Sequence, residues 1–331
     1  MEPTLCNTST SLASALDALR ASDILILDCE GDNLGKQGGT LSIITLHIPS
    51  SNQTYLIDVL RLSSADLRPV YHLLESPSVT KIVFDGRMDY SALYHEKAVD
   101  MQNVLDMQIA DVRSRIVRGE DQEDQFSRLK GFLHWPEIIG QPDSYRKVQR
   151  LNGLKACAKE HEVEVDGLTD VMVTHSAWMA RPLPEQYIQY AITDARLIDI
   201  LYDEFKRCGY IDGVLSQQSM RYITLWKSRQ PRMQDTHLAH PLLPLGVLEN
   251  PEYYICRTCN TCQRELSQDD FSKTGWRIAQ KRVCWVCLAV TKRENMQRDW
   301  DREAYDYHSD DVGFESWRSE GEFGYDDWDS D

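Results

Sequence analysis

The sequence lacks a long apolar segment. Among its 331 residues, no apolar run reaches the roughly 18–20 residues that a membrane-spanning helix requires. The first 22 residues also lack the basic start and apolar stretch of a secretory signal. We therefore expect an intracellular protein, nuclear or cytoplasmic. Its nine cysteines are interpreted in a reducing compartment, where metal binding is more common than disulfide formation.

The net charge of −16 is unevenly distributed along the chain. Residues 1–252 contain 25 basic and 35 acidic side chains and carry −10, whereas residues 253–298 contain nine and four and carry +5. Residues 299–331 contain two basic and thirteen acidic side chains and carry −11. The acidic total argues against a long nucleic-acid groove. It argues less against an enzyme that binds a few terminal nucleotides through bound cations.

Hydrophobic spacing predicts an α/β domain over residues 1–228. Strands are expected at residues 24–27, 38–48, 53–60 and 81–85, the first three as an antiparallel meander. Helices are expected at residues 10–21, 64–75, 89–96, 151–160, 182–209 and about 212–228, the first opening near Thr8, Ser9 or Thr10 and the second at Ser63 or Ser64. Residues 117–150 are polar, and we interpret them as an irregular insertion or substrate-side loop.

Three further regions follow this domain. Residues 229–252 are rich in proline and are predicted to be a linker. Residues 253–298 form a basic segment with paired cysteines, which predicts a small zinc-binding module. Residues 299–331 combine acids with scattered aromatic side chains, and we expect a disordered tail.

Four carboxylates and one tyrosine are candidates for catalysis. Asp28 and Glu30 lie two residues apart at the end of a predicted strand and so share one face. Asp89 falls near the start of a predicted helix, where a carboxylate also serves as an ordinary cap. Tyr190 and Asp194 are four residues apart on the clearest helix and share its face. Each alone has a simple structural explanation, so only their combination indicates a site.

The combination resembles a known family. The stretches LILDCEG, KIVFDGRMDYSALY, LDMQIAD, GLKACAKE and WMARPLPEQYIQYAITDARLI, within residues 10–210, resemble the DEDDy group of 3′→5′ exonucleases, the ribonuclease D and Werner exonuclease-like family. The resemblance implies a ribonuclease H-like fold, a mixed five-stranded sheet flanked by helices. It also implies hydrolysis of RNA or DNA from the 3′ end to nucleoside 5′-monophosphates.

The resemblance further implies the role of each candidate. Asp28, Glu30 and Asp194 would hold one Mg²⁺ or Mn²⁺ ion, Asp28 would bridge to a second, Asp89 would support that second ion, and Tyr190 would orient the attacking water. Asp85 is the less favoured alternative to Asp89. A rival hypothesis is a degenerate exonuclease fold that serves as a nucleic-acid-binding or adaptor protein. All four carboxylates and the tyrosine are present, which favours catalysis.

The cysteine-rich segment predicts a structural zinc site. Cys259-x2-Cys262 and Cys284-x2-Cys287 are separated by 21 residues, close to the spacing of four-cysteine zinc sites. Cys256-x2-Cys259 is a competing first pair. The segment resembles small fungal zinc-binding domains. Its possible roles are nucleic-acid binding, protein docking or folding support, and the acidic tail is a second possible docking segment.

Overall fold

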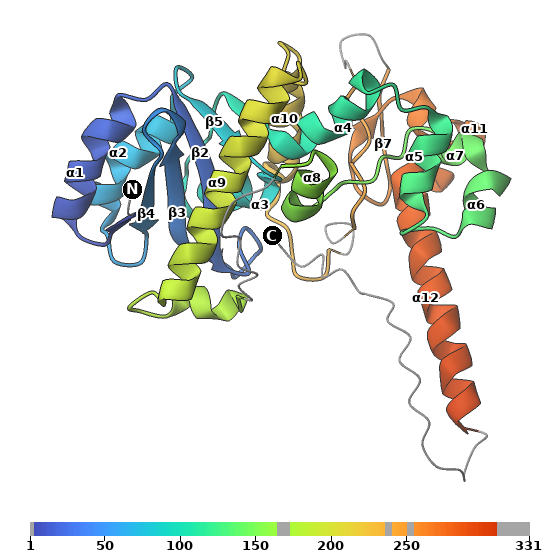
Figure 1. Ribbon diagram of the computed structural model, residues 1–331. Helices are drawn as coiled ribbons and strands as arrows, with labels where there is room; N and C mark the ends of the chain where they lie inside the picture. Colours follow the sequence, from blue (N-terminus) through green and yellow to red (C-terminus); the bar gives the residue numbers. More distant parts are fainter. Residues whose placement is uncertain (1–2, 164–172, 236–239, 250–254, 310–331) are drawn as a thin grey trace. The chain divides into compact units, whose positions relative to one another are not determined.

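A computed structural model describes residues 3–163, 173–235, 240–249 and 255–309 (Figure 1). The chain divides into two compact units: unit 1 is Met1–Gly119 with Asn152–Asp235, and unit 2 is Glu120–Leu151 with Thr236–Asp331. This division differs from the predicted domain boundaries. Residues 120–151 group with the C-terminal segment rather than with the domain predicted at residues 1–228. Within the described residues, no helix is both long and apolar enough to cross a bilayer.

Unit 1 is built on a mixed sheet of six strands in the order β1-β4-β3-β2-β5-β6. The strands are β1 (Thr4–Cys6), β2 (Ile24–Asp32), β3 (Thr40–Ile48), β4 (Gln53–Asp58), β5 (Thr80–Val83) and β6 (Val104–Asp106). The predicted antiparallel meander of β2, β3 and β4 is confirmed. The expected number of five strands is wrong, because β1 adds a short edge strand parallel to β4.

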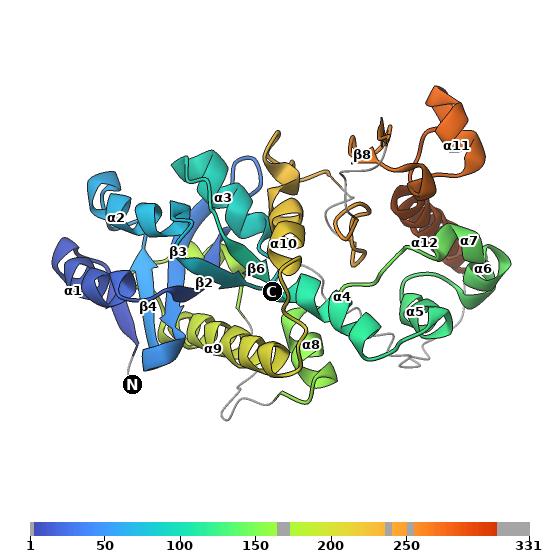
Figure 2. The ribbon, with the colours of Figure 1, turned by 90° about the horizontal axis from the view of Figure 1, so that it is seen from above.

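Helices cover both faces of this sheet (Figure 2). One face carries α1 (Ser9–Arg20), α2 (Ser64–Glu75) and α3 (Arg87–Lys97), and the other carries α9 (Glu185–Arg207). Unit 1 also contains α4 (Met107–Val117), α8 (Leu154–Glu160) and α10 (Leu215–Ile223). Thr8 and Ser63 cap α1 and α2 with their side-chain oxygens, as two of the predicted alternatives required.

Alternation along the strands separates the cores on the two faces. Leu25, Leu27 and Cys29 of β2 belong to the core beneath α1, α2 and α3. Ile43 of β3 packs instead with α9 residues, including Tyr190. Glu30 lies directly opposite Ile43 in the β2–β3 ladder. Because directly opposed residues in a ladder point to the same face, the side chains that alternate with Cys29 face α9.

Unit 2 contains helices where the sequence suggested an irregular loop. Its elements are α5 (Gln122–Leu129), α6 (Trp135–Gly140), α7 (Pro142–Tyr145), the hairpin β7 (Arg257–Thr258) and β8 (Glu265–Leu266), α11 (Lys273–Arg277) and α12 (Trp285–Ser309). Asp121 caps α5 by accepting bonds from the N–H groups of Glu123 and Asp124. The prediction of irregular structure at residues 117–150 is therefore wrong.

One hydrophobic core holds unit 2 together, which explains why residues 120–151 group with the C-terminal segment. Residues from both segments contribute to it, namely Phe126, Leu129, Phe132, Leu133, Ile138, Tyr145, Val148, Leu242, Leu245, Cys259, Leu266, Phe271, Cys284, Val286, Cys287, Ala289 and Val290. Trp276 and Trp285 pack against this core. The contribution from residues 126–148 was not expected from the sequence, which suggested a polar loop there.

Part of the segment predicted to be a disordered tail is helical. Helix α12 continues to Ser309, so the first eleven residues of the predicted tail, 299–309, are helical. The remainder of that tail, residues 310–331, lies outside the described residues.

Candidate active site and metal centre

The exposed end of β2 carries the first two candidate carboxylates. Asp28 lies opposite Thr45 and Glu30 opposite Ile43, and both side chains are partly exposed on the α9 face of the sheet. The ladder is irregular directly after Glu30, at Gly31. A Cβ atom on Gly31 would lie 2.1 Å from the carbonyl oxygen of Thr40. The close approach of β3 to the chain after Glu30 therefore requires glycine.

The third candidate, Asp89, reaches the same stretch of β2. It lies in the first turn of α3, is only 7% exposed, and its Oδ1 accepts a 2.8 Å bond from the Cys29 N–H. The β2–β5 ladder ends at Ile26, so the Cys29 N–H is available for this bond. Burial raises the pKa of the Cys29 thiol, and the nearby charges of Asp89, Asp28 and Glu30 raise it further. The fold thus brings three of the four predicted carboxylates to one end of β2.

Burial perturbs the Asp89 carboxyl strongly. Desolvation raises the pKa of Asp89 to about 7, against the lowering effect of backbone N–H donors that include Cys29. The negative charge of Asp85 adds to the increase. The ionised form of Asp89 is therefore disfavoured in this structure, mainly by burial. A cation beside Asp89 would favour its ionised form.

The fourth carboxylate and the tyrosine lie on α9, which packs against β2. Asp194 is 6% exposed and Tyr190 is 7% exposed, and both lie on the buried side of the helix. The Tyr190 ring lies 6.0 Å from the Trp178 ring, centroid to centroid, in an edge-on arrangement. Helix α9 and the Trp178 indole thus hold the Tyr190 ring on the side of the sheet that Glu30 faces. The metal-binding and catalytic roles of these residues stay predictions.

Arg181, from the WMARPL stretch, anchors the segment before α9. Its guanidinium makes a pair of bonds to Asp58, of 2.6 and 2.9 Å, and donates to the Trp178 carbonyl at 2.8 Å. The Ser42 hydroxyl donates to the same carbonyl at 2.6 Å. Asp58 is not among the residues that the sequence singled out. Its position at the end of β4 carries no local signal for a partner 123 residues away.

A second network fixes the turn before Asp89. Asp85 has φ +52°, and Arg87 binds its carboxylate through two bonds of 2.5 Å. The buried Asp106 accepts from the Asp85 and Gly86 N–H groups at 3.2 and 2.9 Å. The Arg87 guanidinium lies 4.8 Å from the Tyr222 ring centroid. Asp85 is thus engaged in holding the turn, in keeping with the preference for Asp89.

Among the described residues, two groups bring three or more possible metal ligands within 4.8 Å of one another. They are the cysteines of unit 2 and the set Asp111, Cys157 and His161 in unit 1; the four carboxylates are not among them. The ligands of a two-ion site bind metals about 3.5–4 Å apart and spread further than those around one ion. In the second set, Arg115 and His161 each bind Asp111 at 2.9 Å. This set is therefore a neutralised polar network.

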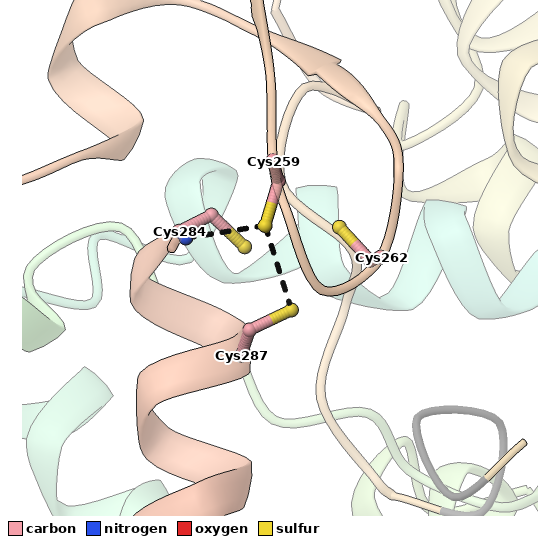
Figure 3. Close-up of side chains that lie close together, drawn as sticks. All are labelled: Cys259, Cys262, Cys284 and Cys287. Carbon is pink, nitrogen blue, oxygen red and sulfur yellow. Dashed lines mark hydrogen bonds between the residues drawn. The ribbon is translucent and has the colours of Figure 1, made fainter. Parts of the chain in front are cut away.

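The four-cysteine cluster has the geometry of a closed metal site (Figure 3). Cys259 and Cys262 lie in the β7–β8 turn, and Cys284 and Cys287 lie at the start of α12. The sulfurs of Cys259 and Cys287 are 3.9 Å apart, and the Cys284 N–H donates to the Cys259 sulfur at 3.4 Å. Four sulfurs about 2.3 Å from a tetrahedral zinc would lie about 3.8 Å apart. The cluster is therefore compatible with zinc.

The environment of the sulfurs agrees with this geometry. Hydrogen bonding among the neighbouring thiols lowers the pKa of Cys259 and raises the pKa of Cys287. The charge of Arg264 interacts with Cys262 and Cys284. Cys256 is exposed and is not part of the cluster, so the geometry selects Cys259-x2-Cys262 as the first pair.

Comparisons with known proteins agree with the resemblance. Residues 3–119 match the family model described as 3′-5′ exonuclease. Ribonuclease D of Bartonella henselae is 26% identical over 199 residues, which cover 60% of this chain and 39% of that protein. The chain thus spans about two fifths of the length of this curated relative.

Solved structures of similar proteins include two ribonucleases D. That of Trypanosoma brucei has a TM-score of 0.49 and 20% identity, with 70% of this chain and 74% of that chain covered. That of Escherichia coli, described as an exoribonuclease, has a TM-score of 0.43 and 21% identity, with 72% and 55% covered. Residues 3–119 are therefore similar to 3′-5′ exonucleases, and a longer part of the chain is similar to a ribonuclease D.

Proposed function

We propose that unit 1 is a metal-dependent exonuclease that shortens nucleic acids from the 3′ end and releases nucleoside 5′-monophosphates. The observation that carries this proposal is the bond between Asp89 and the Cys29 N–H, which adds a third carboxylate to a strand end that already carries Asp28 and Glu30. The curated relative is named ribonuclease D, which favours RNA over DNA as the substrate.

The donor set fits hard divalent cations. Carboxylate oxygens suit Mg²⁺ and Mn²⁺, and Mg²⁺ retains several waters, so few protein ligands suffice. We infer that Asp28, Glu30 and Asp194 hold one ion, and that Asp28 and Asp89 hold a second. Two such ions supply an activated water and stabilise the charge on the leaving oxygen. Four carboxylates would balance their charge and allow an acidic domain to accept a polyanion.

Tyr190 positions the attacking water in this proposal. A tyrosine hydroxyl accepts or donates a hydrogen bond without competing for a cation. The contact with Trp178 restricts the ring, so the hydroxyl has a defined position. The phenol therefore contributes orientation rather than charge.

The cysteine cluster of unit 2 is proposed to hold one structural zinc ion. Four thiolates leave no open coordination position, which argues against a catalytic role for this ion. Its contribution is the stability of unit 2, whose core includes Cys259, Cys284 and Cys287.

The test is cleavage of 5′-labelled RNA and DNA by the purified full chain with Mg²⁺ or Mn²⁺. We expect stepwise shortening from the 3′ end, release of nucleoside 5′-monophosphates and preference for RNA. Asp28→Asn should reduce the rate by at least about 100-fold. Asp32→Asn, at the end of the same strand, is the matched control and should retain activity. Intact substrate with either ion would contradict the proposal and favour a non-catalytic adaptor.

A second variant separates the hydroxyl of Tyr190 from its ring. Tyr190→Phe keeps the aromatic packing against Trp178 and removes only the hydroxyl. We expect kcat to fall by roughly 100-fold with little change in substrate binding. An unchanged kcat would remove the positioning role while leaving the carboxylate assignment intact.

A further inference from the structure

The loop of residues 272–283 in unit 2, here called the basic loop, carries positive charge and no carboxylate of its own. It contains Lys273, Arg277, Lys281 and Arg282 and no acidic residue. Lys273, Arg277 and Lys281 are exposed to solvent. Across the described residues of unit 2, none of these four side chains has an ion-pair partner. The charge of the loop is therefore available to an external anion.

Several other cations of the same unit form ion pairs with carboxylates. Arg128 binds Glu120 at 2.6 Å and Lys147 binds Glu249 at 2.7 Å. Lys292 binds Glu137 at 3.0 Å. In the described part of unit 2, these three cations are thus paired with carboxylates, whereas the four cations of the basic loop are not.

The loop is also held in a fixed shape. A bridge between Phe271 and Cys284 closes its base, next to the four-cysteine cluster. Asn260 binds the loop twice: its side chain donates to the Ala279 carbonyl at 2.7 Å, and its N–H donates to the Arg282 carbonyl at 2.8 Å. Charges on an ordered loop lose less conformational entropy when a ligand binds.

An aromatic and an apolar side chain lie among these charges. Trp276 is partly exposed, and the Arg257 guanidinium lies 4.3 Å from its ring centroid and donates to its carbonyl. Ile278, between Arg277 and Lys281, is 42% exposed. Cations that follow a phosphate backbone, together with apolar surface for unpaired bases, are the common features of single-strand binding sites. An acidic peptide would also bind the cations, but it has no bases to stack on Trp276 and Ile278 and would gain less affinity from these two side chains.

We propose that the basic loop binds single-stranded RNA or DNA through its phosphates, with Lys273, Arg277 and Lys281 as the principal contacts. The proposal rests on the exonuclease function of unit 1 and adds a second binding surface for the same class of substrate. Binding at this surface would supply affinity that the acidic unit 1 lacks.

The experiment is fluorescence anisotropy of labelled single-stranded RNA and DNA with the full chain, without added divalent salt so that no cleavage occurs. Each phosphate contact on a single strand contributes about 0.7 to the slope of log K against log salt. Removing two contacts in the double variant R277Q/K281Q should reduce the slope by about 1.4. At about 0.1 M salt, this corresponds to a loss of affinity of roughly 25-fold.

Arg146→Gln is the matched control, because Arg146 is an exposed cation of unit 2 that pairs with Asp143. It should leave affinity and salt slope unchanged. Circular dichroism and zinc content establish that each variant is folded. Wild-type affinity of the double variant, or displacement of the oligonucleotide by polyglutamate as effectively as by unlabelled RNA, would overturn the proposal.

Hydrolysis of a nitrophenyl ester of a nucleoside 5′-monophosphate distinguishes this inference from the proposed function. This substrate is too small to require a second surface. If the double variant hydrolyses the nitrophenyl ester normally and also binds oligonucleotides as tightly as the wild type does, the inference about the basic loop is wrong but the proposed exonuclease function stands. If the wild type does not hydrolyse it and leaves RNA and DNA intact, the proposed function fails.

Discussion

Loss of the proposed zinc ion should unfold residues 122–148 as well as the cysteine segment. Seven side chains of the insertion, Phe126, Leu129, Phe132, Leu133, Ile138, Tyr145 and Val148, share one core with Cys259, Cys284 and Cys287. Burial of each contributes about 1.5–3 kcal/mol, or roughly 10–20 kcal/mol together before the entropy of ordering is subtracted. A structural zinc ion contributes about 10–16 kcal/mol, which matches or exceeds the stability of a typical domain.

Hydrogen exchange measured by mass spectrometry is the assay for this prediction. In Cys284→Ser, peptides covering residues 122–148 should exchange at the rate of an unfolded chain, whereas peptides from β2 and β3 in unit 1 should stay protected. Cys208→Ser is the matched control, since Cys208 lies at the end of α9 and outside the cluster. Cys256→Ser should retain one zinc per chain. Protection of residues 122–148 in zinc-free protein would refute the reasoning.

Three further predictions concern unit 1. Arg181→Gln should destabilise the fold by about 3–5 kcal/mol in urea unfolding, because it leaves the buried Asp58 carboxylate without its partner; R181Q combined with D58N should recover part of the loss. Burial lowers the pKa of Lys81 to about 8 from its ordinary 10.5. Between pH 8 and pH 10.5 the Lys81 side chain is therefore protonated in the unfolded chain and neutral in the folded protein, so the free energy of unfolding rises with pH over this range. The free energy of unfolding of the wild type, measured relative to that of Lys81→Met, should rise by up to about 3 kcal/mol over this pH range. A difference between the two proteins that does not vary with pH would contradict the prediction. Gly31→Ala should cost about 1–3 kcal/mol in urea unfolding and reduce cleavage, because its Cβ meets the Thr40 carbonyl beside Glu30; wild-type stability would contradict the clash.

Local signals predicted much of unit 1. Helix α9 extends over Glu185–Arg207, within the predicted residues 182–209, because amphipathic spacing over 23 residues is unambiguous. The cap of α2 at Ser63 was one of two predicted alternatives. Strand β1 was missed because three residues are too few to show an alternating pattern.

Contacts distant in sequence were beyond local patterns. The bond that joins Asp89 to Cys29 spans 60 residues, and only the family resemblance suggested that these segments meet. Helices α6 and α7 have six and four residues, too few for a helical period, and both begin with proline in their first turn. Their hydrophobic partners follow about 100 residues later, so the segment alone resembles a polar loop.

The discontinuity of unit 2 has a consequence for synthesis on the ribosome. The insertion ends at Leu151, and the last cysteine of the cluster, Cys287, follows 136 residues later, the difference between 287 and 151. At about 5–20 residues per second, translation of this interval takes roughly 7–27 s. During this time Phe126, Phe132 and their neighbours have left the ribosome without the other half of their core. A nascent chain of this protein therefore passes through a period in which the apolar side chains of the insertion exist but the last cysteines of the cluster have not yet been synthesised.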